Sequence, residues 1–172
     1  MPIARFLAAG AVAALVLCAP AQAATWAWNY SAAGVAAAGT FTTSDTPDAD
    51  GFYAITGITG SRNGVAIVGL EPAGSAIPGN DPYAVDDLVS IADPQLTWSG
   101  FGYALADGGW VNPFSDGSTA WEYLSVPPYP DGAGQEVAVV FSAAPVPEPA
   151  AGLLALMGVA GLAAASRARR AR

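Results

Sequence analysis

Histidine and lysine are absent from this 172-residue chain, and cysteine occurs once, as Cys18. Without histidine, a Ser-His-Asp triad, a Cys-His pair and a histidine-ligated zinc site are all excluded. Carboxylates are the main side chains left for acid–base chemistry, so the enzymatic alternative narrows to a small carboxylate-dependent hydrolase. With this many acidic residues some close pairs arise by chance, and we expect the protein not to be an enzyme.

Positive charge is almost confined to the two ends of the chain. From residue 24 to residue 145 the sequence has thirteen acidic residues and one basic residue, Arg62, a net charge of −12. A domain this acidic is repelled by nucleic acid and by anionic lipid surfaces, so we expect no nucleic-acid partner. The same charge can attract divalent cations or simply keep the domain in solution, and both readings stay open.

The first 23 residues have the three parts of a secretory signal peptide. Arg5 supplies the positive charge, a short apolar run follows it, and Ala21 and Ala23 are the small residues that signal peptidase accepts. We expect an N-terminal signal helix that is cleaved before Ala24. Since Cys18 lies inside this segment, the exported domain would have no disulfide and would depend on packing, or on a metal, for its stability.

The middle of the chain, residues 24–144, alternates short β-prone segments with turns rich in Gly, Pro and Asp. The clearest hairpin joins residues 53–60 to residues 65–70 through Asn63-Gly64, a pair that tolerates positive φ at both turn positions. Further strands are predicted at residues 35–43, 96–105, 110–114, 121–125 and 137–141. We therefore expect one all-β domain, an antiparallel β-sandwich of jelly-roll type.

The C-terminal segment, residues 145–172, has three parts. Val146-Pro147-Glu148-Pro149 comes near its start, an uncharged run at 150–165 follows, and a basic cluster comes last: Arg167, Arg169, Arg170 and Arg172. A helix over the uncharged run would span about 24 Å, slightly less than the thickness of a bilayer core. Arginine side chains can extend over the remaining distance to the membrane surface. We expect a transmembrane helix at 150–165, with the arginines in the cytoplasm and the domain outside the inner membrane.

The order of these parts, together with the signal peptide, resembles the PEP-CTERM sorting signal of Gram-negative bacteria. The resemblance is carried by Val146-Pro147-Glu148-Pro149, by the apolar run and by the terminal arginines. It implies an exosortase substrate that is held in the inner membrane with its domain in the periplasm and is then processed to the cell surface or the extracellular matrix. It also implies signal peptidase and exosortase as partners during export, and an association with exopolysaccharide and biofilm.

Two acidic groups are candidate calcium ligands. Asp45, Asp48 and Asp50 form the first group, and Asp86-Asp87 forms the second. The first group does not have the spacing of an EF-hand loop, and Asp-Gly sequences are also typical of tight turns. We expect no cofactor, and calcium at residues 45–50 remains the alternative to plain turns.

Five tryptophans and six tyrosines suggest sugar binding, because aromatic faces stack on sugar rings. The candidates are Trp98, Trp110, Trp121, Tyr123 and Tyr129. Trp110 and Tyr129 are favoured because they neighbour turns. The alternative is that these aromatic residues belong to the core, as aromatic residues at alternating strand positions usually do.

The sequence thus favours a non-enzymatic protein of the cell envelope or matrix, sorted by its tail and displaying one β-domain in a structural or adhesive role. The alternative is a carbohydrate-binding module for the cell's own exopolysaccharide. A small hydrolase comes third.

Overall fold

The computed structural model describes residues 24–147. The expectations for the signal helix and its residues Ala21 and Ala23 lie outside this range, and so do those for Glu148, Pro149, the helix at 150–165 and the terminal arginines. The described part consists of strands and their connections. Within it, no helix has the length and apolar character needed to cross a bilayer.

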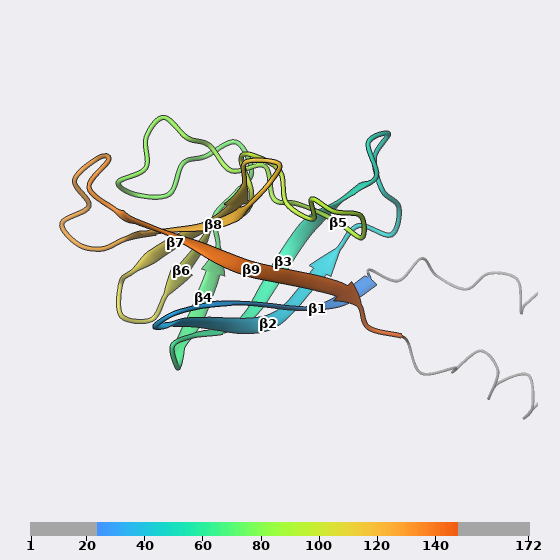
Figure 1. The fold of residues 1–172 in the computed structure, drawn as a ribbon, viewed down its shortest axis with the longest axis horizontal. Coiled ribbons are helices and arrows are strands. Elements are labelled where there is room, and N and C mark those ends of the chain that lie inside the picture. The colour runs from blue at the N-terminus through green and yellow to red at the C-terminus, as the bar shows by residue number, and fades with distance from the viewer. Residues whose placement is uncertain (1–23, 148–172) are drawn as a thin grey trace, which may run out of the picture.

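The described part has nine strands (Figure 1), which are β1 (Ala24–Ala32), β2 (Val35–Thr43), β3 (Phe52–Arg62), β4 (Val65–Leu70), β5 (Leu88–Ser90), β6 (Tyr103–Leu105), β7 (Trp110–Ser115), β8 (Ala120–Ser125) and β9 (Gln135–Pro145). Paired strands are antiparallel, in the order β2-β1-β9-β8-β7-β6-β4-β3, and β5 pairs with the start of β3. The last strand, β9, therefore lies between β1 and β8.

The sheet closes on itself, so the predicted jelly-roll-like β-sandwich is wrong. β2 and β3 stand far apart in the strand order, yet they pair with each other from Ala37↔Arg62 to Thr43↔Ile55. Eight strands thereby form a closed antiparallel barrel, in which neither β2 nor β3 is a free edge. Strands of sandwiches and of barrels both alternate inward and outward side chains, and for this reason the sequence pattern did not separate the two folds.

Two glycines allow β2 and β3 to approach each other. Gly39 lies directly opposite Gly60. A Cβ atom on Gly39 would lie 1.8 Å from the carbonyl oxygen of Thr59, and one on Gly60 would lie 2.2 Å from that of Ala38. Any side chain at either position would push the strands apart. The closure of the barrel therefore depends on two residues that have no side chain.

Aromatic side chains fill the interior of the barrel. β1 alternates exposed and buried positions, so that Trp26, Trp28 and Tyr30 are all buried. Trp28 stacks on Phe41 of β2, with ring centroids 5.3 Å apart, and makes an edge contact with Phe101 at 5.9 Å. β1 lies outside the predicted strands, although this alternation is itself a strand signal. An eight-stranded barrel is just wide enough to be filled by such side chains.

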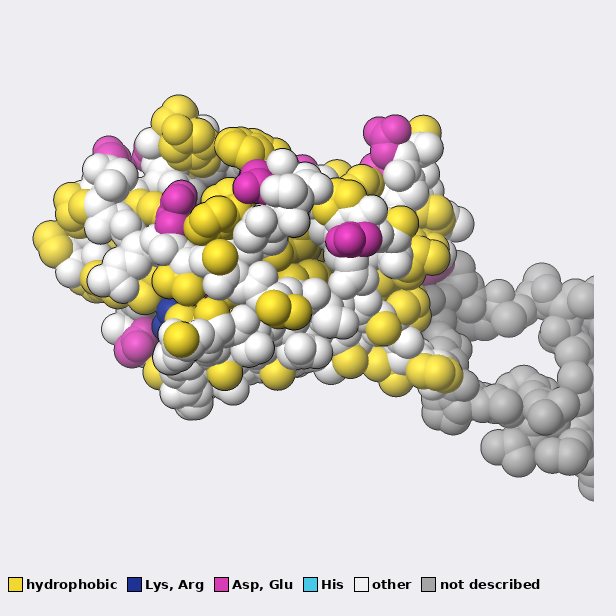
Figure 2. All heavy atoms as spheres, viewed as in Figure 1, with side chains coloured by type: hydrophobic (Ala, Val, Ile, Leu, Met, Phe, Trp, Pro, Cys, Tyr) yellow, Lys and Arg dark blue, Asp and Glu magenta, His cyan; other side chains and the backbone are white. Residues whose placement is uncertain are grey.

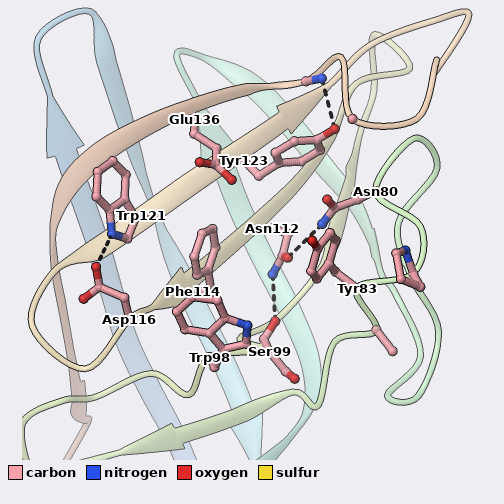
Figure 3. A pocket seen from close by; sticks show the side chains of 14 residues that line it. Asn80, Tyr83, Trp98, Ser99, Asn112, Phe114, Asp116, Trp121, Tyr123 and Glu136 are labelled. Carbon is pink, nitrogen blue, oxygen red and sulfur yellow. Dashed lines mark hydrogen bonds between the residues drawn. The ribbon is translucent and has the colours of Figure 1, made fainter.

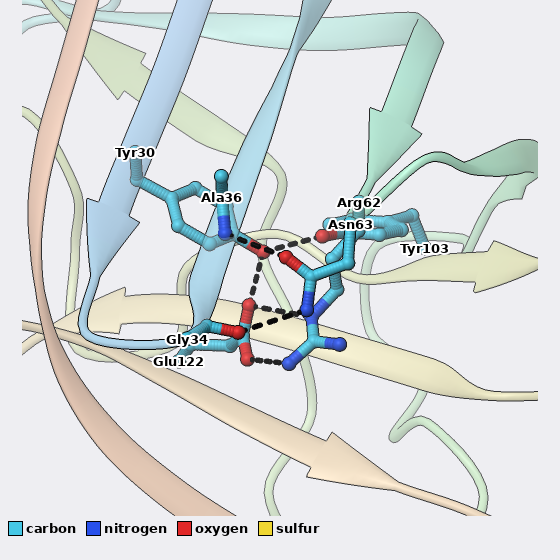
Figure 4. A network of polar contacts seen from close by, with 7 residues as sticks. All are labelled: Tyr30, Gly34, Ala36, Arg62, Asn63, Tyr103 and Glu122. Carbon is cyan, nitrogen blue, oxygen red and sulfur yellow. Dashed lines mark hydrogen bonds and ion pairs between the residues drawn. The ribbon is translucent and has the colours of Figure 1, made fainter.

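A polar network lies buried within this core (Figure 4). Glu122 is 1% exposed and accepts two hydrogen bonds from Arg62, from Nε at 2.9 Å and from Nη2 at 2.5 Å. Tyr30 donates to the same carboxylate and shares a hydrogen bond with Tyr103. Burial, with the charges of Tyr103 and Glu122, raises the pKa of Tyr30 far above its ordinary value, so its hydroxyl remains a donor.

The predicted hairpins are present, with one change in strand length. β3 and β4 are joined by Asn63 and Gly64, whose φ values of 49° and 81° fit a type I′ turn. The strand predicted at 96–105 is wrong over most of its length, because only Tyr103–Leu105 belongs to a strand there. Leu96 and Phe101 are loop residues that insert into the core. The other predicted strands lie within β2, β7, β8 and β9.

Candidate functional site

A cavity of about 830 Å³ lies on the outer side of the barrel (Figure 3). Its floor is formed by β7, β8 and the start of β9. Its rim is formed by residues 80–84 and 98–99, which precede and follow β5 in the chain, and by the loop at residues 132–134. The volume is typical of pockets that bind small ligands.

Strand pairing places aromatic side chains next to each other on the floor of the pocket. Phe114 of β7 lies opposite Trp121 of β8, and Asn112 lies opposite Tyr123. Residues opposite each other and residues two apart share one face of a sheet, so these four side chains form one surface. The hairpin between β7 and β8 therefore sets the shape of the floor.

Two further aromatic residues reach the pocket from its rim. Trp98 makes an edge contact with Phe114, with ring centroids 6.1 Å apart and an angle of 64° between the planes. Trp98 is 65% exposed and Tyr83 is 60% exposed. Large aromatic side chains that remain exposed beside a cavity are typical of a binding surface.

Asn112 holds the rim loop to the floor. Its side chain is buried, and its Nδ2 donates to the carbonyl oxygens of Ser99 and Phe101 at 3.0 Å each. Nδ2 of Asn80 donates to its Oδ1 at 3.3 Å. These bonds fix the segment that carries Trp98, so the pocket is largely formed before a ligand arrives.

Tyr123 connects both rim loops through one hydroxyl group. The hydroxyl donates to the carbonyl oxygen of Gly79 at 2.6 Å and accepts a hydrogen bond from the backbone N–H of Gly134 at 3.0 Å. A Cβ atom on Gly134 would lie 2.2 Å from Cζ of the ring, so glycine is required there for the ring to lie against the loop.

Two carboxylates, Asp116 and Glu136, also line the pocket. Oδ2 of Asp116 accepts a hydrogen bond from Nε1 of Trp121 at 3.0 Å, and Oδ1 accepts from the backbone N–H groups of Ser118 and Thr119 at 2.8 Å each. These donors, Trp121 first, hold the pKa of Asp116 well below its ordinary value. Asp116 stays ionised, which does not suit a general acid.

The pocket contains three of the five candidate aromatic residues: Trp98, Trp121 and Tyr123. The two that were favoured do not line it. Trp110 is half-buried two residues before Asn112 on β7, and the hydroxyl of Tyr129 donates to the carbonyl oxygen of Gly108 at 2.5 Å. A neighbouring turn is therefore a poor guide to a position in this pocket.

Sequence reasoning missed Phe114, Asn112 and Tyr83, and it also missed the two pocket carboxylates, Asp116 and Glu136. The first two had a signal, because the pairs 114 with 121 and 112 with 123 are symmetric about the turn that follows Ser115. Once that turn is accepted, the shared face can be read from the sequence. Tyr83 comes from an irregular loop, and no periodic pattern marks it.

The first acidic group lies on the exposed loop between β2 and β3, away from the pocket. Oδ1 of Asp48 accepts hydrogen bonds from the backbone N–H groups of Asp50 and Phe52, both at 2.9 Å, and so stabilises a tight turn. Asp45 is exposed on the same loop. Across residues 24–147, no three His, Cys, Asp or Glu side chains are grouped so that they could hold a metal ion.

The second acidic group, Asp86-Asp87, directly precedes β5 and follows the rim residue Ala84 by two residues. Oδ1 of Asp86 accepts a hydrogen bond from Thr97 at 2.8 Å. Asp87 is 4% exposed, and its Oδ1 has no hydrogen-bond partner among the described residues. Burial, with the nearby charges of Asp86 and Glu71, raises the pKa of Asp87 to about 7, although a hydrogen bond from the Gly102 backbone opposes the shift.

No protein-family model, curated protein sequence or solved structure matches this chain.

Proposed function

We propose that the chain is an exported, non-enzymatic protein of the cell envelope or extracellular matrix whose domain binds carbohydrate. The observation that carries this proposal is the aromatic surface of the pocket, formed by Trp98, Phe114 and Trp121, with Tyr83 at the rim. The apolar faces of sugar rings pack on aromatic faces, while their hydroxyl groups bind amides and carboxylates. Asn112, Asp116 and Glu136 supply such groups in the same pocket.

The pocket favours carbohydrate binding over a purely structural role. A protein that only fills space in a matrix has no need for exposed aromatic residues around a cavity whose loops are held in place. A hydrolase is disfavoured, because the hydrogen bonds to Asp116 keep it ionised, whereas glycoside hydrolysis needs one carboxyl group that holds its proton.

The proposed cellular location rests on the sequence of residues 145–172, which resembles the PEP-CTERM signal. In this proposal signal peptidase and exosortase process the chain, and the domain reaches the cell surface or matrix. The ends of the barrel support such processing, because Trp26 pairs with Pro145 and the backbone N–H of Val146 donates to Thr25 at 2.7 Å. Cleavage before residue 24 and beyond residue 146 would leave every strand pair intact.

Carbohydrate binding is tested by titrating the purified protein with a panel of bacterial polysaccharides and their oligosaccharides. Trp98→Ala removes an exposed stacking face without removing core volume, and we expect it to weaken binding at least about tenfold. Trp110→Ala, on β7 but outside the pocket, is the tryptophan control and should leave affinity unchanged. Equal affinity of the Trp98 variant and the parent protein would refute the pocket as the site, and failure of every glycan to bind would leave only the structural role.

The proposed cellular location is tested by measuring the intact mass of the native protein in each cellular fraction. We expect the measured mass to match a chain that begins at Ala24. We also expect the protein in the envelope fraction or in the medium. A cytosolic protein with both ends uncut would refute the sorting proposal, whatever the domain binds.

A further inference from the structure

The pocket has negative charge and no positive charge to balance it. Asp116 and Glu136 line it, and none of its lining residues is basic. The basic residue of the described part, Arg62, is 11% exposed and forms an ion pair with Glu122 inside the barrel. Figure 2 shows acidic side chains spread over one face of the molecule and very little basic surface.

Resting on the proposed function, we propose that the pocket binds glycans that carry free amino groups, such as deacetylated glucosamine units, in preference to acidic glycans. At neutral pH a glycan with ammonium groups complements the charge of the site, while a uronic acid or a sulfated sugar is repelled by it. The pocket thereby selects among exopolysaccharides by their charge.

The two carboxylates lie beside one aromatic surface. Asp116 is bound to the indole of Trp121, and Glu136 lies opposite Tyr123, diagonally across the strand pair from Trp121. Figure 3 shows the carboxyl group of Asp116 at this indole and that of Glu136 between Trp121 and Tyr123. Diagonal positions on paired strands lie about 7–8 Å apart, within reach of one sugar residue.

This arrangement suits an amino sugar. A ring that stacks on Trp121 directs its substituents sideways, toward the carboxylates. The ammonium group can form a charge-assisted hydrogen bond with the carboxylate of Glu136, which lines the pocket, and it is also attracted to the aromatic faces. An N-acetyl group in the same place can still donate its amide N–H to a carboxylate, but it carries no positive charge for the carboxylates and the aromatic faces to attract.

The test compares short oligosaccharides of equal length, one fully deacetylated and one fully N-acetylated, by calorimetric titration of the full chain in detergent. We expect the deacetylated form to bind with a 1:1 stoichiometry and at least about fivefold more tightly, with the preference falling as salt concentration rises. We expect Glu136→Gln to weaken binding of the deacetylated form about threefold more than binding of the acetylated form, so that the preference falls about threefold.

Asp45→Asn is the matched control, because it removes one exposed carboxylate from a loop outside the pocket. If it lowers the preference as much as Glu136→Gln does, the attraction belongs to the whole acidic domain and the inference fails. Equal binding of both oligosaccharides, or tighter binding of a polyuronate, refutes the inference but leaves carbohydrate binding in place. If no oligosaccharide binds, the proposed function fails with it.

Discussion

At the scale of single residues, the hydroxyl of Tyr123 joins the floor of the pocket to both rim loops. We expect Tyr123→Phe to leave the carbonyl of Gly79 and the N–H of Gly134 without this partner and to lower the free energy of unfolding by about 1–3 kcal/mol. Hydrogen exchange of residues 76–84 and 127–134 should rise together. Tyr129→Phe, which loses a bond outside the pocket, should not increase exchange at residues 76–84.

The buried carboxylate of Glu122 depends on Arg62 for its charge balance. We expect Arg62→Met to lower the free energy of unfolding by about 3–5 kcal/mol, because an unpaired charge then remains in the core. Urea denaturation of the parent protein and of Arg62→Met measures this loss of unfolding free energy. Adding Glu122→Leu should recover most of the loss, and a double variant no more stable than the single one would contradict the assignment.

Asp87 makes stability depend on pH. Its pKa is about 7 in the folded protein and about 4 in an unfolded chain, so between these values the folded state holds a proton that the unfolded state has lost. Its contribution is therefore complete below about pH 4 and is lost as the pH rises through 7. We expect the free energy of unfolding to fall by up to about 4 kcal/mol over this range.

The measurement for Asp87 is urea denaturation at several pH values. Asp87→Asn should flatten the fall, since asparagine does not titrate and tolerates the positive φ of 55° at this position. If the free energy of unfolding depends on pH equally in the parent protein and the variant, the pH dependence comes from other groups, of which Asp86 and Glu71 are the nearest.

The residues of the site were partly predictable. Trp98, Trp121 and Tyr123 could be named as candidates from the chemistry of their side chains, and all three line the pocket. Choosing among candidates required knowing which face of which strand each occupies. That information comes from the register of the β7–β8 hairpin, which the turn after Ser115 indicates but which a choice by side-chain chemistry alone does not use.

At the scale of elements, the contact between β2 and β3 decides between an open and a closed sheet. We expect Gly39→Ala to lower the free energy of unfolding by about 2–3 kcal/mol, because its Cβ would overlap the backbone of Thr59. Gly57→Ala on β3 is the matched control, since its Cβ would lie 3.6 Å from Thr42, an ordinary contact, and should change stability by less than about 1 kcal/mol. Thermal denaturation compares the two, and similar losses would contradict the role given to Gly39.

Strands with a distinctive turn were predictable, and the closure was not. Asn63-Gly64 identifies the β3–β4 hairpin, because few other residue pairs accept its backbone angles. The pairing of β2 with β3 leaves a trace only in Gly39 and Gly60, and isolated glycines in a strand have several other meanings. β1 could have been recognised from the alternation of Trp26, Trp28 and Tyr30.

At the scale of the whole molecule, the two ends of the described chain leave the barrel together, and the pocket lies on its side wall. Trp26 is paired with Pro145 at the end where β1 begins and β9 finishes. The pocket floor includes Glu136, near the opposite end of β9. One strand therefore connects the point where the tail leaves to the place where a glycan would be held.

This connection determines how the domain would bear a mechanical pull. A tether on the tail and a polymer in the pocket would stretch β9 along its own axis, while its hydrogen bonds to β1 and β8 run across that axis. The bonds to β8 hold residues 135–139 of β9 and those to β1 hold residues 140–145, so a pull along the strand would load both sets in shear. A domain fixed to a cell and gripping a strand of matrix in flowing water would be pulled in the direction in which its sheet resists most strongly.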